Sequence, residues 1–408
     1  MGLLTHDKTH LLNKDAKKSS SREVGAVILG GCFQGLGIAR SLGRQGIPVC
    51  ILDDEFAISR YSRYTTYSAH VKNLKNERQI IKALFEARER WDLANWVIYP
   101  TRDELVAALS HFRDELSTDF RVPTPSWEVI RWTSDKRNTY QLADSIGIPT
   151  PRTWYVNDVR ELGTLEDKLP LVIKPAIKEH FIYATRVKAW RANTKSELRE
   201  RFLLAYDILG PDEIMLQELI AGGGDQQFSY CAFFKEGQAL GHMTCLRRRQ
   251  HPLEFGRAST FVETIELPVL EELSNRFLKA IDYYGLIEME YKYDQYDATY
   301  KLLDVNARTW GYHSLGARAG VDFSAMLFAD QLGQTVEPRR ARPGVQWVRL
   351  ITDLPTGMQE LARQRLSAPE YWRTLHHFDV EAVFDRNDPL PGLMELFVSP
   401  YLYFKRGF

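Results

Sequence analysis

Hydrophobic and polar residues alternate with periods that change along the chain and divide it into segments. Residues 23–55 begin with an apolar run at Ala26–Leu29, pass through a glycine cluster into a helical stretch, and end with a second apolar run at Val49–Leu52. Residues 96–109 repeat the order of strand, loop and helix. Since strand–helix–strand units build parallel sheets, this pattern predicts a doubly wound domain over 23–125.

The pattern changes after residue 125 to helices mixed with short, often antiparallel strands. Residues 134–154 predict a helix that starts at a Ser134 cap and stops at Gly147. Residues 213–249 predict antiparallel strands separated by glycine turns. Further elements are predicted as a strand within 169–176, a helix within 266–285 that ends at its glycine, and two final strands, "LIEMEYKYD" and "YKLLDVNAR".

The two ends of the chain differ from this central part. The first 22 residues are rich in Lys, Ser and Asn and lack the apolar core of a secretion signal, so we interpret them as a disordered tail. Beyond residue 335, prolines mix with short helical stretches. We therefore expect a small C-terminal extension at 336–408 that packs on the rest.

Charge and cysteine content exclude several classes of protein. The 408 residues carry 53 basic and 53 acidic side chains, so we expect neither a nucleic-acid nor a membrane partner. No apolar run approaches the roughly 18 residues of a membrane helix. The four cysteines, Cys32, Cys50, Cys231 and Cys245, are too scattered for a zinc site or a disulfide framework, which favours the reducing cytoplasm.

Polar side chains recur at every second position of the last two predicted strands. Asp304, Asn306 and Arg308 share one face of their strand, and Glu288 and Glu290 share a face of the preceding one. Antiparallel pairing would bring Glu290 near Asp304 and Asn306. These hard oxygen donors suit Mg²⁺, and the Arg308 fork suits an anion. The alternative interpretation is a solvated sheet face with a local salt bridge.

Two lysines strengthen the interpretation as a site. Lys174 ends a buried apolar strand, and Lys136 begins a helix. Ammonium groups at such positions can neutralise phosphate oxygens, although either lysine alone would be read as a surface residue.

Five short motifs then follow in an order that resembles the ATP-grasp superfamily over residues 24–335. They are "SDK" at 134–136, "VIKP" at 172–175, "LQELI" at 216–220, "GLIEMEY" at 285–291 and "DVNAR" at 304–308.

The resemblance implies a fold and a set of ligands. It implies an α/β and α+β chain with a Rossmann-like domain at 23–125, an ATP-grasp domain of two α+β subdomains at 126–335 whose lid covers about 135–212, and the C-terminal extension. The implied site binds ATP through Lys136, Lys174, Gln217, Glu218, Leu219, Ile220 and Asp225, and Mg²⁺, or Mn²⁺ in its place, through Glu290, Asp304 and Asn306.

The segments "STFVET", "NARTWG" and "VFDRNDPLPGL" resemble the carboxylate–amine ligase branch, which includes D-aspartate ligases and carbamoyl-phosphate-synthase-like proteins. This branch implies an enzyme that joins a small-molecule carboxylate to an amine through an acyl phosphate and releases ADP and phosphate. Lys174 and Arg308 would be catalytic. Homodimers are common among such proteins.

Two departures from the family pattern keep other functions open. The metal strand carries Asp304 where the family has Glu, and the flap at 176–190 lacks glycines, so Lys178, His180 and Lys188 would have to contact the phosphates. A non-catalytic ATP-binding module is therefore an alternative.

An NAD-dependent oxidoreductase is a second alternative. The cluster "GGCFQGLG" follows a strand, with Asp53 and Asp54 about 20 residues on, but its spacing is irregular for a dinucleotide fingerprint. In the same region Arg102 could meet a substrate carboxylate, and in the basic run "CLRRRQHP" Arg247 or Arg249, beside Arg257, could face phosphates.

Overall fold

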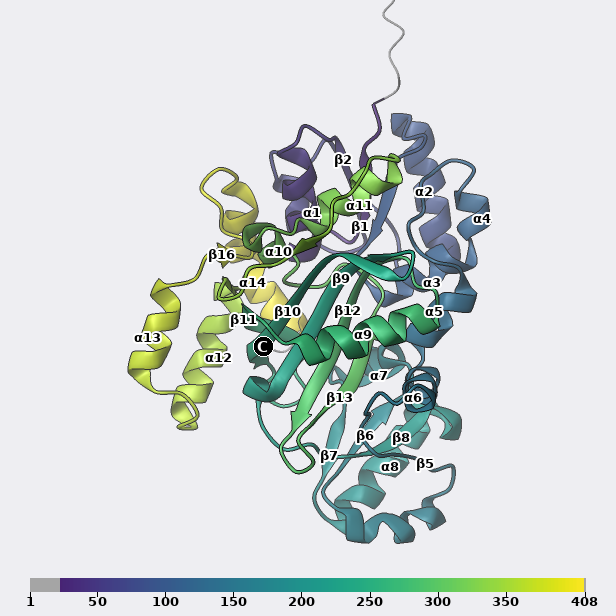
Figure 1. Ribbon diagram of the computed structural model, residues 1–408, viewed down its shortest axis with the longest axis vertical. Coiled ribbons are helices and arrows are strands. Elements are labelled where there is room, and N and C mark those ends of the chain that lie inside the picture. Colours follow the sequence, from purple (N-terminus) through teal and green to yellow (C-terminus); the bar gives the residue numbers. More distant parts are fainter. Residues whose placement is uncertain (1–22, 407–408) are drawn as a thin grey trace, which may run out of the picture.

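Three β-sheets organise residues 23–406, which are the residues that the computed structural model describes. Figure 1 shows a parallel sheet at the top, an eight-stranded sheet in the middle and a small antiparallel sheet at the bottom. The tail predicted at residues 1–22 lies outside the described residues.

The first sheet has the strand order β3-β2-β1-β4, and all its pairings are parallel. Every residue of β1, β2 and β4 is buried, as expected for strands that helices cover on both faces. The strand–helix–strand unit predicted at 23–55 and the strand, loop and helix predicted at 96–109 are confirmed. The elements are β1 (Ala26–Leu29), α1 (Phe33–Gly43), β2 (Val49–Asp53), β3 (Tyr67–His70), α2 (Glu77–Trp91), β4 (Val97–Pro100), α3 (Asp103–His111) and α4 (Arg113–Leu116).

The eight-stranded sheet has the order β13-β12-β9-β10-β11-β15-β16, with β14 paired beside β10. Its strands are β9 (Gln227–Lys235), β10 (Gln238–His251), β11 (Ala258–Ile265), β12 (Gly285–Asp294), β13 (Thr299–Asn306), β14 (Arg339–Arg340), β15 (Gln346–Val348) and β16 (Val380–Glu381). Helix α9 (Pro268–Ala280) lies across one face, over β9 and β10 (Figure 1). The opposite face is thereby left for other partners.

The third sheet, with order β5-β8-β6-β7, folds around a core of its own. Leu171, Phe181, Phe202 and Leu216 are fully buried in that core. The elements of this part are β5 (Thr153–Tyr155), β6 (Leu171–Pro175), α7 (Lys178–Thr185), β7 (Trp190–Ala192), α8 (Lys195–Leu209) and β8 (Ile214–Glu218).

One hydrophobic core, in contrast, joins the first sheet to the eight-stranded sheet. Ile28 and Ile51 of the first sheet belong to the same buried cluster as Phe233, Trp310 and Trp347. These two sheets are therefore packed as one body, whereas the third sheet has the separate core that independent movement requires.

The C-terminal residues extend the eight-stranded sheet and pack on both larger sheets. Arg249 of β10 forms a two-point ion pair with Asp353 at 2.8 and 2.9 Å, and Arg40 of α1 pairs with Asp388 at 2.9 Å. The remaining helices are α5 (Trp127–Ser134), α6 (Lys136–Ser145), α10 (Ser314–Ala319), α11 (Phe323–Gln331), α12 (Leu350–Ala362), α13 (Ala368–His376) and α14 (Leu390–Arg406).

Three local predictions were wrong. Ser134 is the last residue of α5, and the cap of α6 is Asp135, which accepts a hydrogen bond from the Arg137 amide at 2.9 Å. Gly285 begins β12 and does not end α9. Strand β8 pairs with β5 and β6 of the third sheet, so it is not part of the antiparallel run of β9 and β10. Sequence periodicity cannot reveal which sheet a strand joins.

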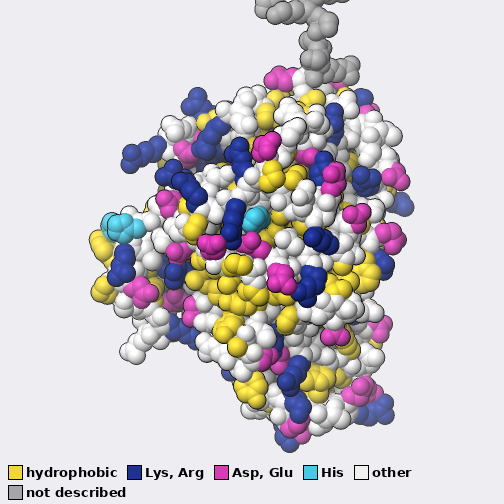
Figure 2. Space-filling view, viewed as in Figure 1, with side chains coloured by type: hydrophobic (Ala, Val, Ile, Leu, Met, Phe, Trp, Pro, Cys, Tyr) yellow, Lys and Arg dark blue, Asp and Glu magenta, His cyan; other side chains and the backbone are white. Residues whose placement is uncertain are grey.

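Helix length, surface charge and cysteine state can be described for this part of the chain. Among residues 23–406, none of the helices combines the length and apolar character needed to cross a membrane. Figure 2 shows Lys and Arg interspersed with Asp and Glu over this face of the molecule. All four cysteines are free.

Candidate active site

The hairpin of β12 and β13 aligns the predicted oxygen donors. Glu290 lies directly opposite Asp304, and Glu288 lies opposite Asn306. The Asn306 amide nitrogen donates to Glu290 Oε1 at 3.0 Å and to Glu288 Oε2 at 3.2 Å. The predicted antiparallel pairing, with these side chains on one face, is confirmed.

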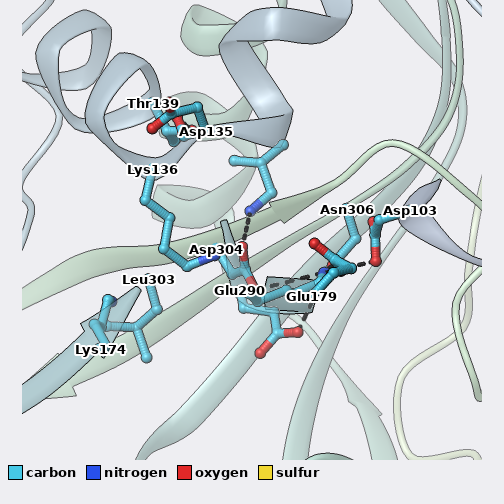
Figure 3. Close-up of polar contacts among 12 residues, drawn as sticks. Asp103, Asp135, Lys136, Thr139, Lys174, Glu179, Glu290, Leu303, Asp304 and Asn306 are labelled. Atoms are coloured by element: carbon cyan, nitrogen blue, oxygen red, sulfur yellow. Dashed lines mark hydrogen bonds and ion pairs between the residues drawn. The ribbon is translucent and has the colours of Figure 1, made fainter. Parts of the chain in front are cut away.

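Basic side chains surround the two facing carboxylates. Lys136 Nζ donates to Asp304 Oδ1 at 2.7 Å, and the Arg247 guanidinium pairs with Glu290 (Figure 3 shows Lys136 reaching toward Asp304). Burial favours the neutral acid, but Lys136 and Lys178 hold the pKa of Asp304 well below its usual range. Against the same effect of burial, Arg247 and Lys188 lower the pKa of Glu290 to about 2. Both acids are therefore ionised at neutral pH.

Lys174 lies in a different environment, because its hydrogen-bond partners are neutral. Its ammonium donates to Tyr140 Oη at 2.8 Å and to Gln217 Oε1 at 2.9 Å. Burial, reinforced by the positive charge of Lys136, lowers the pKa of Lys174 to about 7. An anion in the cavity would supply the negative partner that this lysine lacks.

A cavity of about 1190 Å³ lies between the third sheet and the eight-stranded sheet. It brings together predicted residues that are distant in the sequence. The predicted residues that line it are Lys136, Lys174, Gln217, Glu218, Leu219, Ile220, Asp225, Glu290 and Asp304. Asn306 and Arg308 are not among its lining residues, but Asn306 contacts the lining residues Glu290 and Lys178, and Arg308 contacts Asn306.

The segment after β8 forms one end of this cavity. The Glu218 carboxylate accepts from the Arg152 amide at 3.0 Å and from Lys301 Nζ at 2.7 Å, which fixes the end of the strand. Leu219 and Ile220 follow with apolar surface facing the cavity. Asp225 is exposed at the same end. A flat apolar group of a ligand could therefore lie against Leu219 and Ile220 at this end, beside the exposed carboxylate of Asp225.

Arg308 lies beside Asn306, where it contacts the first residue of α3. Its Nε donates to Asp103 Oδ2 at 3.0 Å and its Nη2 to Asn306 Oδ1 at 3.1 Å. Lys178 Nζ also contacts Asp103 Oδ2, at 2.7 Å. The predicted anion-binding arginine is therefore placed beside the oxygen donors, with Asp103 as its counter-charge.

Other candidate residues fall into two groups. Lys178 and Lys188 line the cavity, whereas His180 turns away to Glu213 at 2.7 Å. Arg249 is committed to its buried pair with Asp353, and Arg257 Nη1 donates to the Arg186 carbonyl at 3.1 Å. Within the basic run it is therefore Arg247 that faces the oxygen donors.

The glycine cluster after β1 is explained by close packing. Asp53 accepts from the Gly31 amide at 2.6 Å and pairs with Arg102, also at 2.6 Å. Arg102 also pairs with Asp54 at 2.8 Å. A Cβ at Gly30 would lie 2.1 Å from Thr101 Oγ1. These contacts argue against a free acid for a dinucleotide ribose and against a free Arg102 for a substrate carboxylate.

The oxygen donors of the β12–β13 hairpin fit a single hard cation for which a bound substrate supplies further oxygen ligands. Glu290, Asp304 and Asn306 present two ionised carboxylates and an amide oxygen, which Mg²⁺ accepts as ligands. Within residues 23–406 no three His, Cys, Asp or Glu side chains form a metal-binding group by themselves. A metal ion held here would need oxygen ligands besides the two carboxylates, such as the Asn306 amide oxygen. Glu288 is held by Ser229 and Tyr312 and faces the same side.

Two residues of this site were missed from the sequence. Within the segment 96–109, Asp103 was considered only as a possible helix cap, yet its carboxylate reaches Arg308 and Lys178. Tyr140 accepts from Lys174 and donates to the Leu303 carbonyl at 2.9 Å. The signal for Asp103 was its position at the carboxyl end of a parallel strand, where ligands of such sheets bind.

Comparison with known proteins gives relatives of one kind, although no family model matches the chain. A D-aspartate ligase of Enterococcus faecium (strain Aus0004) is 25% identical over 300 residues, which span 69% of this chain and 70% of that relative. The MgADP complex of a biotin carboxylase domain from the 2-oxoglutarate carboxylase of Hydrogenobacter thermophilus superposes with a TM-score of 0.62, at 17% identity over 80% of this chain and 74% of that one.

An L-amino acid ligase from Bacillus licheniformis superposes with a TM-score of 0.59, at 14% identity over 80% of this chain and 79% of that chain. At these identities the solved structures establish the fold alone. The order of the motifs, the fold and the D-aspartate ligase relative agree, so the chain resembles ATP-grasp ligases of the carboxylate–amine branch.

Proposed function

We propose that this chain uses ATP to join a small-molecule carboxylate to an amine through an acyl phosphate, with release of ADP and phosphate. The observation that carries the proposal is the register of β12 and β13, which places Glu290 opposite Asp304 on the wall of the cavity that Lys136 and Lys174 also line. Ionised oxygen donors and ammonium groups thus face one space. Phosphoryl transfer depends on this combination, because its catalysis is mostly positioning and charge neutralisation.

The nucleotide would lie along the cavity. Its adenine would contact the segment Gln217–Ile220, and a ribose hydroxyl would reach Asp225. Its phosphates would meet Lys136 and Lys174. Because Lys174 has neutral hydrogen-bond partners, phosphate oxygens would favour its charged form more than any group now beside it.

The hairpin would hold the metal. Glu290, Asp304 and Asn306 would bind Mg²⁺, or Mn²⁺ in its place, which when bound neutralises phosphate oxygens and orients the transferred group. Arg247 keeps Glu290 ionised and fixed in place. Asp304 is one methylene shorter than the family's Glu, and Lys136 at 2.7 Å keeps it ionised as well.

The reaction would run in two displacements. A carboxylate oxygen of the acid attacks the γ-phosphorus, the bond to the bridging oxygen breaks, and ADP leaves. The amine then attacks the acyl carbon, phosphate leaves with the electron pair of the carbon–oxygen bond, and the amine nitrogen loses a proton. Lys136 and Lys174 spread the charge of the first step. Arg308 stabilises the acyl phosphate and the oxyanion of the second step.

We also propose a division of labour along the chain. Residues 23–125 form the Rossmann-like domain and 126–335 the ATP-grasp domain, with a lid at about 135–212. The separate core of the third sheet supports the lid assignment. Within the lid, residues 176–190 would cover the triphosphate and exclude water from the acyl phosphate. The extension at 336–408 supports the large sheet.

The setting of the reaction follows from the same features. We propose small-molecule substrates and a cytoplasmic location, in line with the four free cysteines and the balanced charge. We also propose a homodimer, since the biotin carboxylase domain of Hydrogenobacter thermophilus was solved as a dimer.

The deciding experiment is an ADP-release screen of the purified chain against an array of carboxylates paired with amines. We expect ADP release that needs both partners and a product whose mass is the sum of acid and amine minus water. With the acid's carboxylate labelled in heavy oxygen, one labelled oxygen should appear in the released phosphate. ADP formation without transfer of the label would refute the acyl phosphate. Nucleotide binding without ADP release for every pair would support a non-catalytic ATP-binding module.

A further inference from the structure

Lys178, the first residue of α7, bridges the metal hairpin and the first sheet. Its Nζ donates to Asn306 Oδ1 at 2.7 Å and lies 2.7 Å from Asp103 Oδ2. Asp304 Oδ2 is 3.9 Å from the same nitrogen. Figure 3 labels the three residues that these oxygens belong to, which are Asn306, Asp103 and Asp304. A lysine ammonium thus occupies the amide oxygen that the proposed metal needs.

Helix α7 is held in this position by the neighbouring helix α3. Tyr183 Oη donates to Glu104 Oε1 at 2.6 Å, and Lys75 Nζ lies 3.6 Å from the centre of the Tyr183 ring. Asp103 and Glu104, which are consecutive in α3, therefore contact Lys178 and Tyr183, which lie between one and two turns apart in α7. Lys178 lines the same cavity as Lys136 and Lys174, so its ammonium is within reach of a ligand there.

A lysine ammonium and a divalent cation compete for these oxygens. Both are cations, and close approach of like charges in a buried site is strongly unfavourable. Asn306 contributes one side-chain oxygen, which Lys178 and Arg308 already share. An amide oxygen has two lone pairs, so metal binding at Asn306 requires that at least one of these two cations move.

Asp103 keeps its ion pair with Arg308 when Lys178 moves away. Arg308 Nε remains 3.0 Å from Asp103 Oδ2, so departure of Lys178 leaves no uncompensated buried carboxylate. The lysine itself has a long, flexible stem and loses little when a triphosphate oxygen replaces a carboxylate. Exchange of partners is thus feasible without unfolding the site.

We propose that Lys178 is a catalytic residue that exchanges Asn306 and Asp103 for the triphosphate of the nucleotide, and thereby releases Asn306 to the metal. The inference rests on the nucleotide and metal assignments of the proposed function. If Lys178 moves in this way, the metal binds tightly only when the nucleotide is also bound. The affinity for the metal and the affinity for the nucleotide are then coupled, so each ligand strengthens the binding of the other by the same factor.

The test measures metal binding without turnover, using Mn²⁺ and its electron paramagnetic resonance signal in the nucleotide-free protein. We expect Lys178→Met to bind Mn²⁺ about tenfold more tightly than the wild type, because the competing cation is gone. Lys188→Met is the matched control. It removes the same charge from the same cavity, and Lys188 makes no hydrogen bond or ion pair with the three donors in residues 23–406.

A second measurement adds a non-hydrolysable ATP analogue. Wild-type Mn²⁺ affinity should rise strongly on addition of the analogue, and the increase should be smaller in Lys178→Met. Lys178→Gln, compared by circular dichroism, provides a second variant should the methionine disturb the fold.

The outcomes separate the two proposals. The proposed exchange of partners by Lys178 would be overturned if Lys178→Met and Lys188→Met increased the Mn²⁺ affinity equally. It would also be overturned if neither Lys178→Met nor Lys178→Gln increased the Mn²⁺ affinity. Failure of the wild type to bind Mn²⁺ even with the analogue would instead refute the metal assignment of the proposed function.

Discussion

Lys174 Nζ donates to Gln217 Oε1 across 2.9 Å, from one strand of the third sheet to its neighbour. Gln217 in turn donates to Thr153 Oγ1 at 2.9 Å, so the amide is oriented with its oxygen toward the lysine. The ammonium is thereby aimed into the cavity by neutral groups. A charged lysine without a carboxylate partner is a site prepared for an anionic ligand.

Lys174→Ala should therefore abolish most ATP-dependent turnover while leaving the fold intact. Loss of a group that stabilises the transferred charge is expected to lower kcat by about a hundredfold or more. The measurement is steady-state ADP release, with far-ultraviolet circular dichroism as the check on folding. Lys72→Ala, at an exposed lysine, is the control and should behave as wild type. Full activity in Lys174→Ala would remove this lysine from the mechanism.

Nucleotide affinity should fall as pH rises above about 7. Burial and Lys136 lower the pKa of Lys174 to about 7, so the free protein loses this charge above that pH. A bound triphosphate favours the charged form of Lys174 and raises its pKa. At a pH between the pKa values of the free and the bound protein, nucleotide binding therefore takes up a proton. The affinity should then weaken by up to about tenfold per pH unit. Calorimetry in buffers of different ionisation enthalpy measures the proton uptake, which Lys174→Met should lack. A pH-independent affinity from neutral to alkaline pH would contradict this prediction.

Asn306→Ala should weaken the dependence on Mg²⁺ more than the binding of adenine. The change removes the amide oxygen that the metal would use and the amide nitrogen that donates to Glu290, but it leaves the segment after β8 untouched. We expect the Mg²⁺ concentration for half-maximal activity to rise by about tenfold or more. Metal-free ADP binding, measured by fluorescence titration, should change little. Asn193→Ala, at an exposed asparagine, serves as the control, and an unchanged magnesium titration would count against the metal assignment.

The C-terminal residues should contribute to stability through Asp353. Its side chain is fully buried and pairs with buried Arg249, which also lies 4.4 Å from the centre of the Phe261 ring. Asp353→Ala leaves a buried guanidinium unpaired and should lower the free energy of unfolding by about 3–5 kcal/mol.

Urea denaturation followed by tryptophan fluorescence measures this change. Glu86→Ala, which breaks an exposed pair with Lys82, should cost less than about 1 kcal/mol. Replacement of both partners, as Arg249→Met with Asp353→Leu, should recover much of the loss. A cost for Asp353→Ala as small as that of Glu86→Ala would show that the pair does not hold the extension in place.

Much of the site could be predicted from the sequence because its signals are local. The alternation of Asp304 and Asn306 along one strand fixes the face that they share, whatever the strand packs against. The lysine of "VIKP" and the strand-to-hinge segment "LQELI" also carry their pattern within a few residues. These positions do line one cavity or contact its walls.

The sequence by itself determined the strand–helix–strand unit at 23–55, the last two strands and the face on which the oxygen donors lie, since period and turn chemistry act over short distances. Only the tertiary structure decided that β8 joins the third sheet, that Asp103 reaches Arg308 across the join between sheets, and that Lys178 contacts Asn306. Each of these pairings connects residues far apart in the chain, and it is set by how separate cores pack, which no local pattern encodes.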